Sequence, residues 1–316
     1  MLQPGAHNSR LSPVRIIEVS PRDGLQNEPE FVPTARKIAL INALSHTGVA
    51  EIEAGSFVSL TAIPQLADSD EVFRAIERVP GVRYSALVPN ERGLERARAA
   101  AVNKIAVFTA ASDSFTRHNI KATVHESLAR FRPIVRAAKR DGLAVRSYVS
   151  TAVFCPYEGR MPPALVMDVM KRLFDLGVDD ISLGETVGRA SPSDVRSLLD
   201  TVMAQVEPAR LSLHFHDTYG MAVANVLTAW WDYGITAFDC SAGGLGGCPY
   251  APGASGNVAT EDVVFALKAS GAVVLVDEML VVACAQQLRD LVRHSLNSRL
   301  SHLSPLPKPA RTEGVT

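Results

Sequence analysis

The feature that most constrains the fold is a regular alternation of short β-rich runs with longer helical patterns along this chain of 316 residues. Several of the β-rich runs are almost continuously apolar, as expected when helices cover a parallel sheet on both faces. The predicted strands are residues 14–20, 51–55, 83–88, 104–110, 144–151, 180–185, 210–217 and 237–241. Eight strand–helix units in a chain of this length predict a (β/α)₈ TIM barrel.

The segments between these runs have apolar residues at helical spacing, as Ile38, Ile41 and Leu44 do in the first of them. The predicted helices are residues 34–47, 69–78, 91–101, 124–139, 163–176, 192–206, 220–233 and 260–270. An additional C-terminal helical segment, 277–296, is expected after the eighth unit. An open doubly wound sheet is the alternative, but no GxGxxG motif follows the first strand to support it.

One barrel domain is expected to span residues 14–297, with flexible tails at 1–13 and 304–316. Hydrophobic residues make up 47% of the chain, and the formal net charge is −1 with no long run of one sign. Nucleic acid and anionic membranes are therefore not expected as partners. The sequence also has no 18-residue apolar run that would predict a transmembrane helix, and no apolar core of a signal peptide near its start.

The four cysteines show no CxxC spacing, which favours reduced thiols in a cytoplasmic protein. Cys240 and Cys284 are expected to be buried packing residues, and the role of Cys155 is left open. Cys248 lies in the glycine-rich segment 243–257, which can approach a ligand closely or act as a lid. Cys248 is therefore a candidate nucleophile or proton donor.

Two histidines, His214 and His216, are separated by one residue in a predicted buried strand. Side chains two positions apart on a strand point to the same face, so the two imidazoles can coordinate one divalent metal ion. A hydrogen-bonded pair of core histidines is the alternative. Asp23 can add a carboxylate oxygen and Asn257 a carbonyl oxygen, although Asp23 could also be an ordinary turn residue. Such a ligand set suits Mg²⁺ or Mn²⁺ and does not exclude Zn²⁺.

In such a barrel, the chemistry takes place at the carboxyl ends of the strands. Arg22 follows the first predicted strand, Glu53 ends the second and Glu185 ends the sixth. Arg22 could stabilise an oxyanion on a carbonyl or thioester, form a salt bridge with Glu53, or do both. Arg146 and Ser150 lie on the fifth strand, and Arg146 is a candidate substrate contact.

A polar cluster of Arg117, His118 and Asn119 follows the fourth predicted strand. This cluster could meet a phosphate group, with Asn119 as a candidate substrate contact, and a solvated loop is the alternative. Trp230 and Trp231 are expected to pack on the barrel wall.

With these residues in view, the chain resembles the 3-hydroxy-3-methylglutaryl-CoA (HMG-CoA) lyase family, a metal-dependent branch of TIM-barrel lyases and Claisen-type synthases. The resemblance covers about residues 14–297. It rests on EVSPRDGLQNE at 18–28, CPYEG at 155–159, HFHDTYG at 214–220 and GLGGCPYAPGASGN at 244–257.

The resemblance implies that the metal ligands are Asp23, His214, His216 and Asn257. It also implies that Arg22 is the catalytic arginine, Cys248 an active-site loop cysteine, Glu53 a site carboxylate and Gln26 a polar residue of the pocket. The implied reaction cleaves an HMG thioester into acetoacetate and acetyl-CoA, with an acyl-CoA thioester as partner and a role in leucine degradation. His214 or a nearby carboxylate would act as the base, Arg22 would stabilise the enolate, and Cys248 would help to reprotonate it.

The sequence departs from the family pattern in three places. Glu185 replaces the usual aspartate in Gly-Asp-Thr-Ile-Gly, where the resemblance implies a catalytic carboxylate near the metal-bound hydroxyl. Leu60-Thr61-Ala62 replaces Pro-Lys-Trp. Phe154 replaces a small residue before Cys155. These changes predict a modified pocket wall and weak cleavage of HMG-CoA unless the pocket compensates, with a related 3-hydroxyacyl-CoA as the alternative substrate.

Two other classes of protein are the alternatives. A Claisen-type acyltransferase of the isopropylmalate or homocitrate synthase kind would share the barrel and the metal site. Such synthases usually have extra C-terminal regions and lack the Gly-Gly-Cys-Pro-Tyr pattern. A catalytically inactive binding module is disfavoured because all the candidate ligands are present. The sequence leaves a homodimer or a larger homo-oligomer open.

Overall fold

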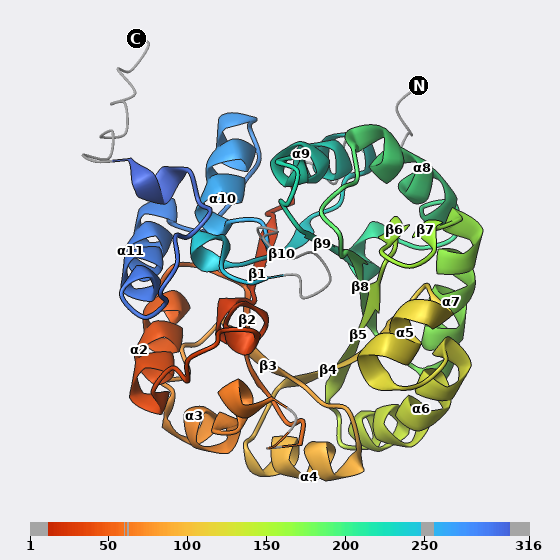
Figure 1. Ribbon diagram of the computed structural model, residues 1–316, viewed down its shortest axis with the longest axis horizontal. Coiled ribbons are helices and arrows are strands. Elements are labelled where there is room, and N and C mark those ends of the chain that lie inside the picture. The colour runs from red at the N-terminus through yellow and green to blue at the C-terminus, as the bar shows by residue number, and fades with distance from the viewer. Residues whose placement is uncertain (1–11, 60, 62, 248–255, 304–316) are drawn as a thin grey trace.

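Eight parallel strands close into a barrel in the computed structural model, which describes residues 12–59, 61, 63–247 and 256–303 (Figure 1). The order around the barrel is β1-β10-β9-β8-β5-β4-β3-β2. The strands are β1 Arg15–Glu18, β2 Glu51–Ser56, β3 Arg83–Leu87, β4 Lys104–Ala110, β5 Ala144–Ser150, β8 Asp180–Glu185, β9 Leu211–Phe215 and β10 Ala237–Cys240. The predicted TIM barrel is confirmed, and each strand overlaps its predicted run.

Helices form a ring outside the barrel, because each has one apolar face that the strands bury. They are α2 Thr34–Ser45, α3 Ser69–Ala75, α4 Glu91–Ala99, α6 Val124–Arg140, α7 Pro163–Leu176, α8 Pro192–Val202, α9 Ala222–Tyr233 and α10 Thr260–Ala269. The expected additional helix is α11, Glu278–Arg289, which lies between α10 and α2 and completes the ring. Among the described helices, none has the length and apolar character needed to cross a membrane.

Three elements near the barrel mouth were not predicted. The first is a π-helical turn, η1 (Ser20–Gly24), in which the backbone N–H groups of Arg22, Asp23 and Gly24 all point to the carbonyl of Val19. This turn ends β1 earlier than the sequence predicted. The other two are helix α5 (Asp113–Ile120) and the two-stranded hairpin of β6 (Phe154–Cys155) and β7 (Gly159–Arg160). The cluster around Asn119 is therefore helical rather than a solvated loop.

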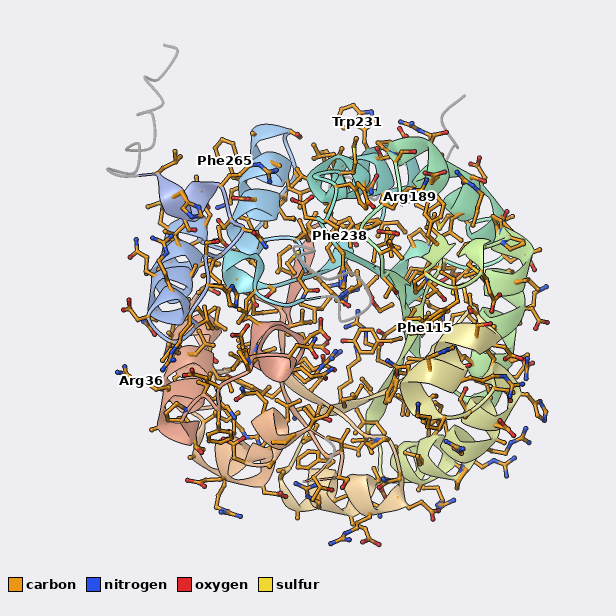
Figure 2. All side chains as sticks on the ribbon, in the orientation of Figure 1. Arg36, Phe115, Arg189, Trp231, Phe238 and Phe265 are labelled. Carbon is orange, nitrogen blue, oxygen red and sulfur yellow. The ribbon has the colours of Figure 1, made fainter. Side chains whose placement is uncertain are left out.

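Burial confirms most of the expected packing residues. Cys240 and Cys284 are buried, and Cys155 is buried as well. Trp230 is buried in the ring of helices, as expected. Trp231 is 48% exposed on the outside of α9 (Figure 2), so its predicted place on the barrel wall is wrong. Helical periodicity explains the difference, because adjacent residues on a helix point about 100° apart.

Candidate active site

Three predicted metal ligands meet at one end of the barrel. The turn η1 presents Asp23, β9 presents His214, and His216 follows directly after β9. One ligand atom from each residue lies within 4.8 Å of the other two. The Nε2 atoms of the histidines are 3.2 Å apart, and the Nε2 of His214 is 3.9 Å from Oδ2 of Asp23. The predicted pairing of the imidazoles on one face is therefore present.

Asn257 joins this group from the segment that follows β10, the strand between β1 and β9. Its backbone pairs with that of His216 in an isolated β-bridge. Its Nδ2 donates to Oδ2 of Asp23 at 3.0 Å and to the carbonyl of Leu245 at 3.1 Å. Its Oδ1 is buried without a hydrogen-bond partner in the described part of the chain. Buried carbonyl oxygens normally have a partner, so this orphan fits the predicted role of a ligand.

The protonation states also fit a divalent cation. Burial and the neighbouring His214 lower the pKa of His216 to about 4, so its imidazole is neutral near pH 7. Burial opposes ionisation of Asp23, but Arg22 and His214 hold the pKa of its carboxyl well below the usual range. Two nitrogens, a carboxylate and an amide oxygen are a donor set that Mg²⁺, Mn²⁺ or Zn²⁺ can accept.

Arg22 is fixed beside this group. Its Nε and Nη2 both lie 2.6 Å from Oε2 of Glu53, and its Nη1 lies 2.5 Å from Oδ1 of Asp23. Burial alone would lower its pKa, but the carboxylates of Glu53 and Asp23 raise it above the ordinary value. The predicted salt bridge with Glu53 is present, and it holds a permanent positive charge next to the metal ligands.

Tyr148 is a site residue that the sequence analysis missed. Its hydroxyl donates to Oε2 of Glu53 at 3.1 Å, and the Arg22 guanidinium lies 5.4 Å from the centre of its ring. It stands on β5 two positions from both Arg146 and Ser150. The two-residue period of a strand that identified the histidines could therefore have identified it.

A cavity of about 410 Å³ opens above these groups. Its polar lining includes the predicted residues Gln26, Asn119 and Ser150. Its opposite wall is apolar and is formed by Val58, Ile63, Leu87, Phe108, Phe115 and Ile120. Phe115, on the side of α5 that faces the barrel, is labelled in Figure 2. The cavity thus joins a charged end, suited to a carboxylate and hydroxyl, to a wall suited to an apolar chain.

Glu185 does not line this cavity, although the sequence placed it near the reacting hydroxyl. Glu185 pairs with Phe215 in the sheet, whereas its neighbour Gly184 pairs with His214 and lines the cavity. Side chains alternate along a strand, so Glu185 points to the opposite face from the histidines. Burial, partly offset by the backbone N–H groups of residues 187–190, raises its pKa to about 7. Its extra methylene therefore does not enter the cavity.

The structure does not bring Arg146 or Cys155 into the cavity either. Arg146 lies near the start of β5, where its Nη2 is 2.6 Å from Oδ1 of Asp239 and its Nε is 3.4 Å from Oδ1 of Asp180. This position is below the cavity floor, so direct contact with substrate is not supported. The thiol of Cys155 donates to Oγ of Ser112 at 3.1 Å. Cys248 lies outside the described residues, and its role stays a prediction.

Fold and site together define a TIM barrel with a candidate His-x-His metal site at the carboxyl ends of its strands. The HMGL-like family model matches residues 13–292, and the chain belongs to the HMGL-like family.

Curated relatives and solved structures agree with this assignment. The cytoplasmic 3-hydroxy-3-methylglutaryl-CoA lyase of Mus musculus is 47% identical over 291 residues, which cover 92% of this chain and 84% of that protein. The mitochondrial hydroxymethylglutaryl-CoA lyase of Bos taurus is 49% identical over 82% of this chain and 79% of that protein. The HMG-CoA lyase of Bacillus subtilis superimposes with a TM-score of 0.89 at 44% identity, covering 92% of this chain and 97% of that one.

An HMG-CoA lyase from Acinetobacter baumannii, in complex with coenzyme A and 3-methylmalate, has a TM-score of 0.87 at 39% identity. The superposition covers 95% of this chain and 99% of the Acinetobacter baumannii chain. The lyase names of these relatives favour cleavage over Claisen-type condensation for proteins of this kind.

Proposed function

We propose that this protein is a divalent-metal-dependent carbon–carbon lyase that cleaves HMG-CoA into acetyl-CoA and acetoacetate. The observation that carries the proposal is the meeting of Asp23, His214 and His216 with the fixed guanidinium of Arg22 in one cavity. The curated relatives with lyase names, 46–49% identical to this chain, support the same reaction.

Each group has a distinct task in this reaction. A bound Mg²⁺ or Mn²⁺ would supply Lewis acidity toward the C3 hydroxyl of the substrate. A carboxylate near this hydroxyl, of which Asp23 lines the cavity, takes its proton, because the free ring nitrogen of His214 faces the metal ion. Arg22 stabilises the negative charge that develops on the enolate oxygen when the C2–C3 bond breaks. Its two carboxylate partners hold it in position, so little reorganisation is needed as the charge develops.

The remaining predicted residues take supporting tasks in the proposal. Gln26 and Asn119 line the cavity and contact the acyl-CoA thioester. Cys248 donates the proton that converts the enolate to acetyl-CoA. A cytoplasmic location, a role in leucine degradation and a homo-oligomeric state remain proposals. The relatives include both cytoplasmic and mitochondrial forms.

A metal-removal experiment tests the proposal. Purified protein is treated with a chelator, desalted and assayed for acetyl-CoA release from HMG-CoA with Mg²⁺, Mn²⁺ or Zn²⁺ added back. We expect no activity without metal and recovery with Mg²⁺ or Mn²⁺. The His216→Ala variant should fold but fail to recover, whereas His46→Ala, which changes an exposed histidine, should recover like the wild type. Full activity in the metal-free wild type would rule out the proposed mechanism.

A further inference from the structure

A buried carboxylate lies behind one of the two histidines and was not among the predicted site residues. Asp239, on β10, is 1% exposed and faces the ring of His214 from the side opposite the cavity. We propose that Asp239 is a positioning residue, which holds the Nδ1–H of His214 so that the Nε2 lone pair is presented to the metal ion. This inference rests on the metal site of the proposed function.

The imidazole of His214 spans two groups of different kinds. Its Nδ1 is buried, has no hydrogen-bond partner of good geometry among the described residues, and lies 3.5 Å from Oδ2 of Asp239. Its Nε2 lies 3.2 Å from Nε2 of His216 and 3.9 Å from Oδ2 of Asp23. A neutral imidazole carries its proton on one nitrogen only. A carboxylate at Nδ1 can accept a proton but cannot donate one, so it selects the tautomer whose Nε2 is free to bind a cation.

Asp239 is itself held rigidly by groups on neighbouring strands. Arg146 on β5 donates from Nη2 to its Oδ1 at 2.6 Å, and Ser182 on β8 donates from Oγ to its Oδ2 at 2.7 Å. Burial would raise the pKa of this carboxyl, but Arg146, His214 and Ser182 together outweigh burial and lower the pKa to about 2. Asp239 is therefore a fixed negative charge behind His214. This arrangement also gives Arg146 a task, because it anchors the carboxylate that orients a ligand.

The two histidines differ in this respect. Among the described residues, the carboxylate of Asp239 lies within 4 Å of Nδ1 of His214, and no carboxylate lies that close to Nδ1 of His216. A carboxylate behind a ligating imidazole increases its donor strength, and removal of such a partner typically weakens metal binding by about 10–100-fold. Asp239 should therefore contribute to metal affinity without touching the metal or the substrate.

A pair of matched variants tests this role. Asp239→Asn and Asp180→Asn each remove one carboxylate that contacts Arg146, but only Asp239 reaches His214. Binding of Mn²⁺ to metal-free protein, without substrate, is measured by titration calorimetry. We expect Asp239→Asn to weaken Mn²⁺ binding by about 10–100-fold and Asp180→Asn by less than about threefold. Saturating Mn²⁺ should then restore much of the turnover of Asp239→Asn.

Equal Mn²⁺ affinities of wild type and Asp239→Asn would overturn the role of Asp239 while leaving the proposed lyase function intact. Failure of the wild type to bind any divalent cation would overturn both. If Asp239→Asn does not fold, nitrogen-15 NMR of histidine-labelled, metal-free wild type gives the answer, with the signals of His214 assigned by their loss in His214→Gln. We expect the proton on Nδ1 of His214, and a proton on Nε2 instead would refute the inference.

Discussion

Arg22 has an arrangement that differs from an ordinary salt bridge at the rim of a barrel. One edge of its guanidinium binds Glu53, and Nη1 binds Asp23, so a single cation joins a buried carboxylate to a predicted metal ligand. The hydroxyl of Tyr148 donates to the same Oε2 of Glu53 that Arg22 binds. This geometry fixes the charge before substrate arrives, which is what stabilisation of a developing oxyanion requires.

Replacement of this arginine should therefore affect turnover more than substrate affinity. We expect Arg22→Met to lower kcat by about 10²–10³-fold, because the charge acts on the enolate rather than on the ground state. Steady-state kinetics with HMG-CoA and circular dichroism check the rate and the fold. Arg22→Lys, which keeps the charge but loses the paired hydrogen bonds, is the control and should lose less. A change confined to KM would contradict the enolate role.

Glu261 is a buried carboxylate on α10. Both of its carboxylate oxygens accept from the backbone N–H of Gly243, at 3.2 and 3.1 Å. Burial raises its pKa from 4.5 to about 7. Between these two pH values the folded state keeps a proton that the unfolded state has released. Stability should therefore fall as the pH rises from 4.5 to 7, by up to about 3 kcal/mol for a shift of this size.

In the variant Glu261→Gln the side chain cannot ionise, so the loss of stability between pH 4.5 and 7 should disappear. Denaturant unfolding should show it more stable than the wild type at pH 8, with the advantage shrinking at pH 5. Glu71→Gln, at an exposed position on α3, is the control and should show no such crossover. If Glu261→Gln were equally destabilised at both pH values, the hydrogen bonds of the carboxylate would matter more than its ionisation.

At the scale of elements, helix α5 depends on the β6–β7 hairpin. Ser112 caps the helix by accepting from the N–H of Phe115 at 3.0 Å. Glu158, in the turn of the hairpin, accepts from Oγ of Ser112 at 2.6 Å and from the N–H of Ser114 at 2.9 Å. Because α5 carries Phe115 and Asn119 into the cavity wall, the hairpin sets the shape of that wall.

Loss of this contact should loosen α5 and weaken substrate binding. We expect Glu158→Ala to raise KM for HMG-CoA by about 3–10-fold, in line with the roughly 1 kcal/mol that a helix cap contributes, and to leave kcat nearly unchanged. Hydrogen exchange of residues 113–120 should speed up. Glu126→Ala removes a similar capping carboxylate from α6, outside the cavity, and should leave KM unchanged. Equal effects of the two variants would show that the hairpin has no particular role.

At the scale of the whole molecule, a buried ion network connects strands across the lower barrel. Lys104 on β4 lies 3.2 Å from Oε2 of Glu51 on β2 and 2.9 Å from Oδ2 of Asp180 on β8. Arg146 on β5 continues the network to Asp239 on β10. Buried charges of this kind add little net stability, but removal of one partner leaves the others unpaired. The network therefore favours one register of barrel closure.

Lys104→Met should destabilise the barrel by about 3–5 kcal/mol, because it leaves the buried Glu51 and the partly buried Asp180 without their shared cation. Denaturant unfolding of the two proteins gives the difference in free energy. Lys268→Met removes a lysine that pairs with Glu278 near the surface, and it should cost about 0–1 kcal/mol. A loss below 1 kcal/mol for Lys104→Met would mean that neighbouring cations, such as Arg146, compensate fully.

The sequence alone determined the barrel and the grouping of the candidate metal ligands Asp23, His214 and His216. Strands 104–110 and 180–185 and helix 163–176 have the bounds that their patterns predicted, because hydrophobic periodicity is a local property. The two-residue period of a strand likewise placed His214 and His216 on one face. The elements that were missed, η1, α5 and the β6–β7 hairpin, depend on hydrogen bonds such as those to Val19 and Glu158, which leave no periodic pattern.

Only the tertiary structure decided which strand residues face the cavity and which face the layers around it. Glu185 and Arg146 stand on the predicted strands. The pairing register of β8 turns Glu185 to the face opposite the histidines, and the position of Arg146 along β5 leaves it below the cavity. Asp239 is an acidic residue in a short apolar run, and its task appears only once β10 closes beside β9. Closure of a barrel brings together side chains from strands far apart in sequence, and their relative heights depend on the stagger of all eight strands.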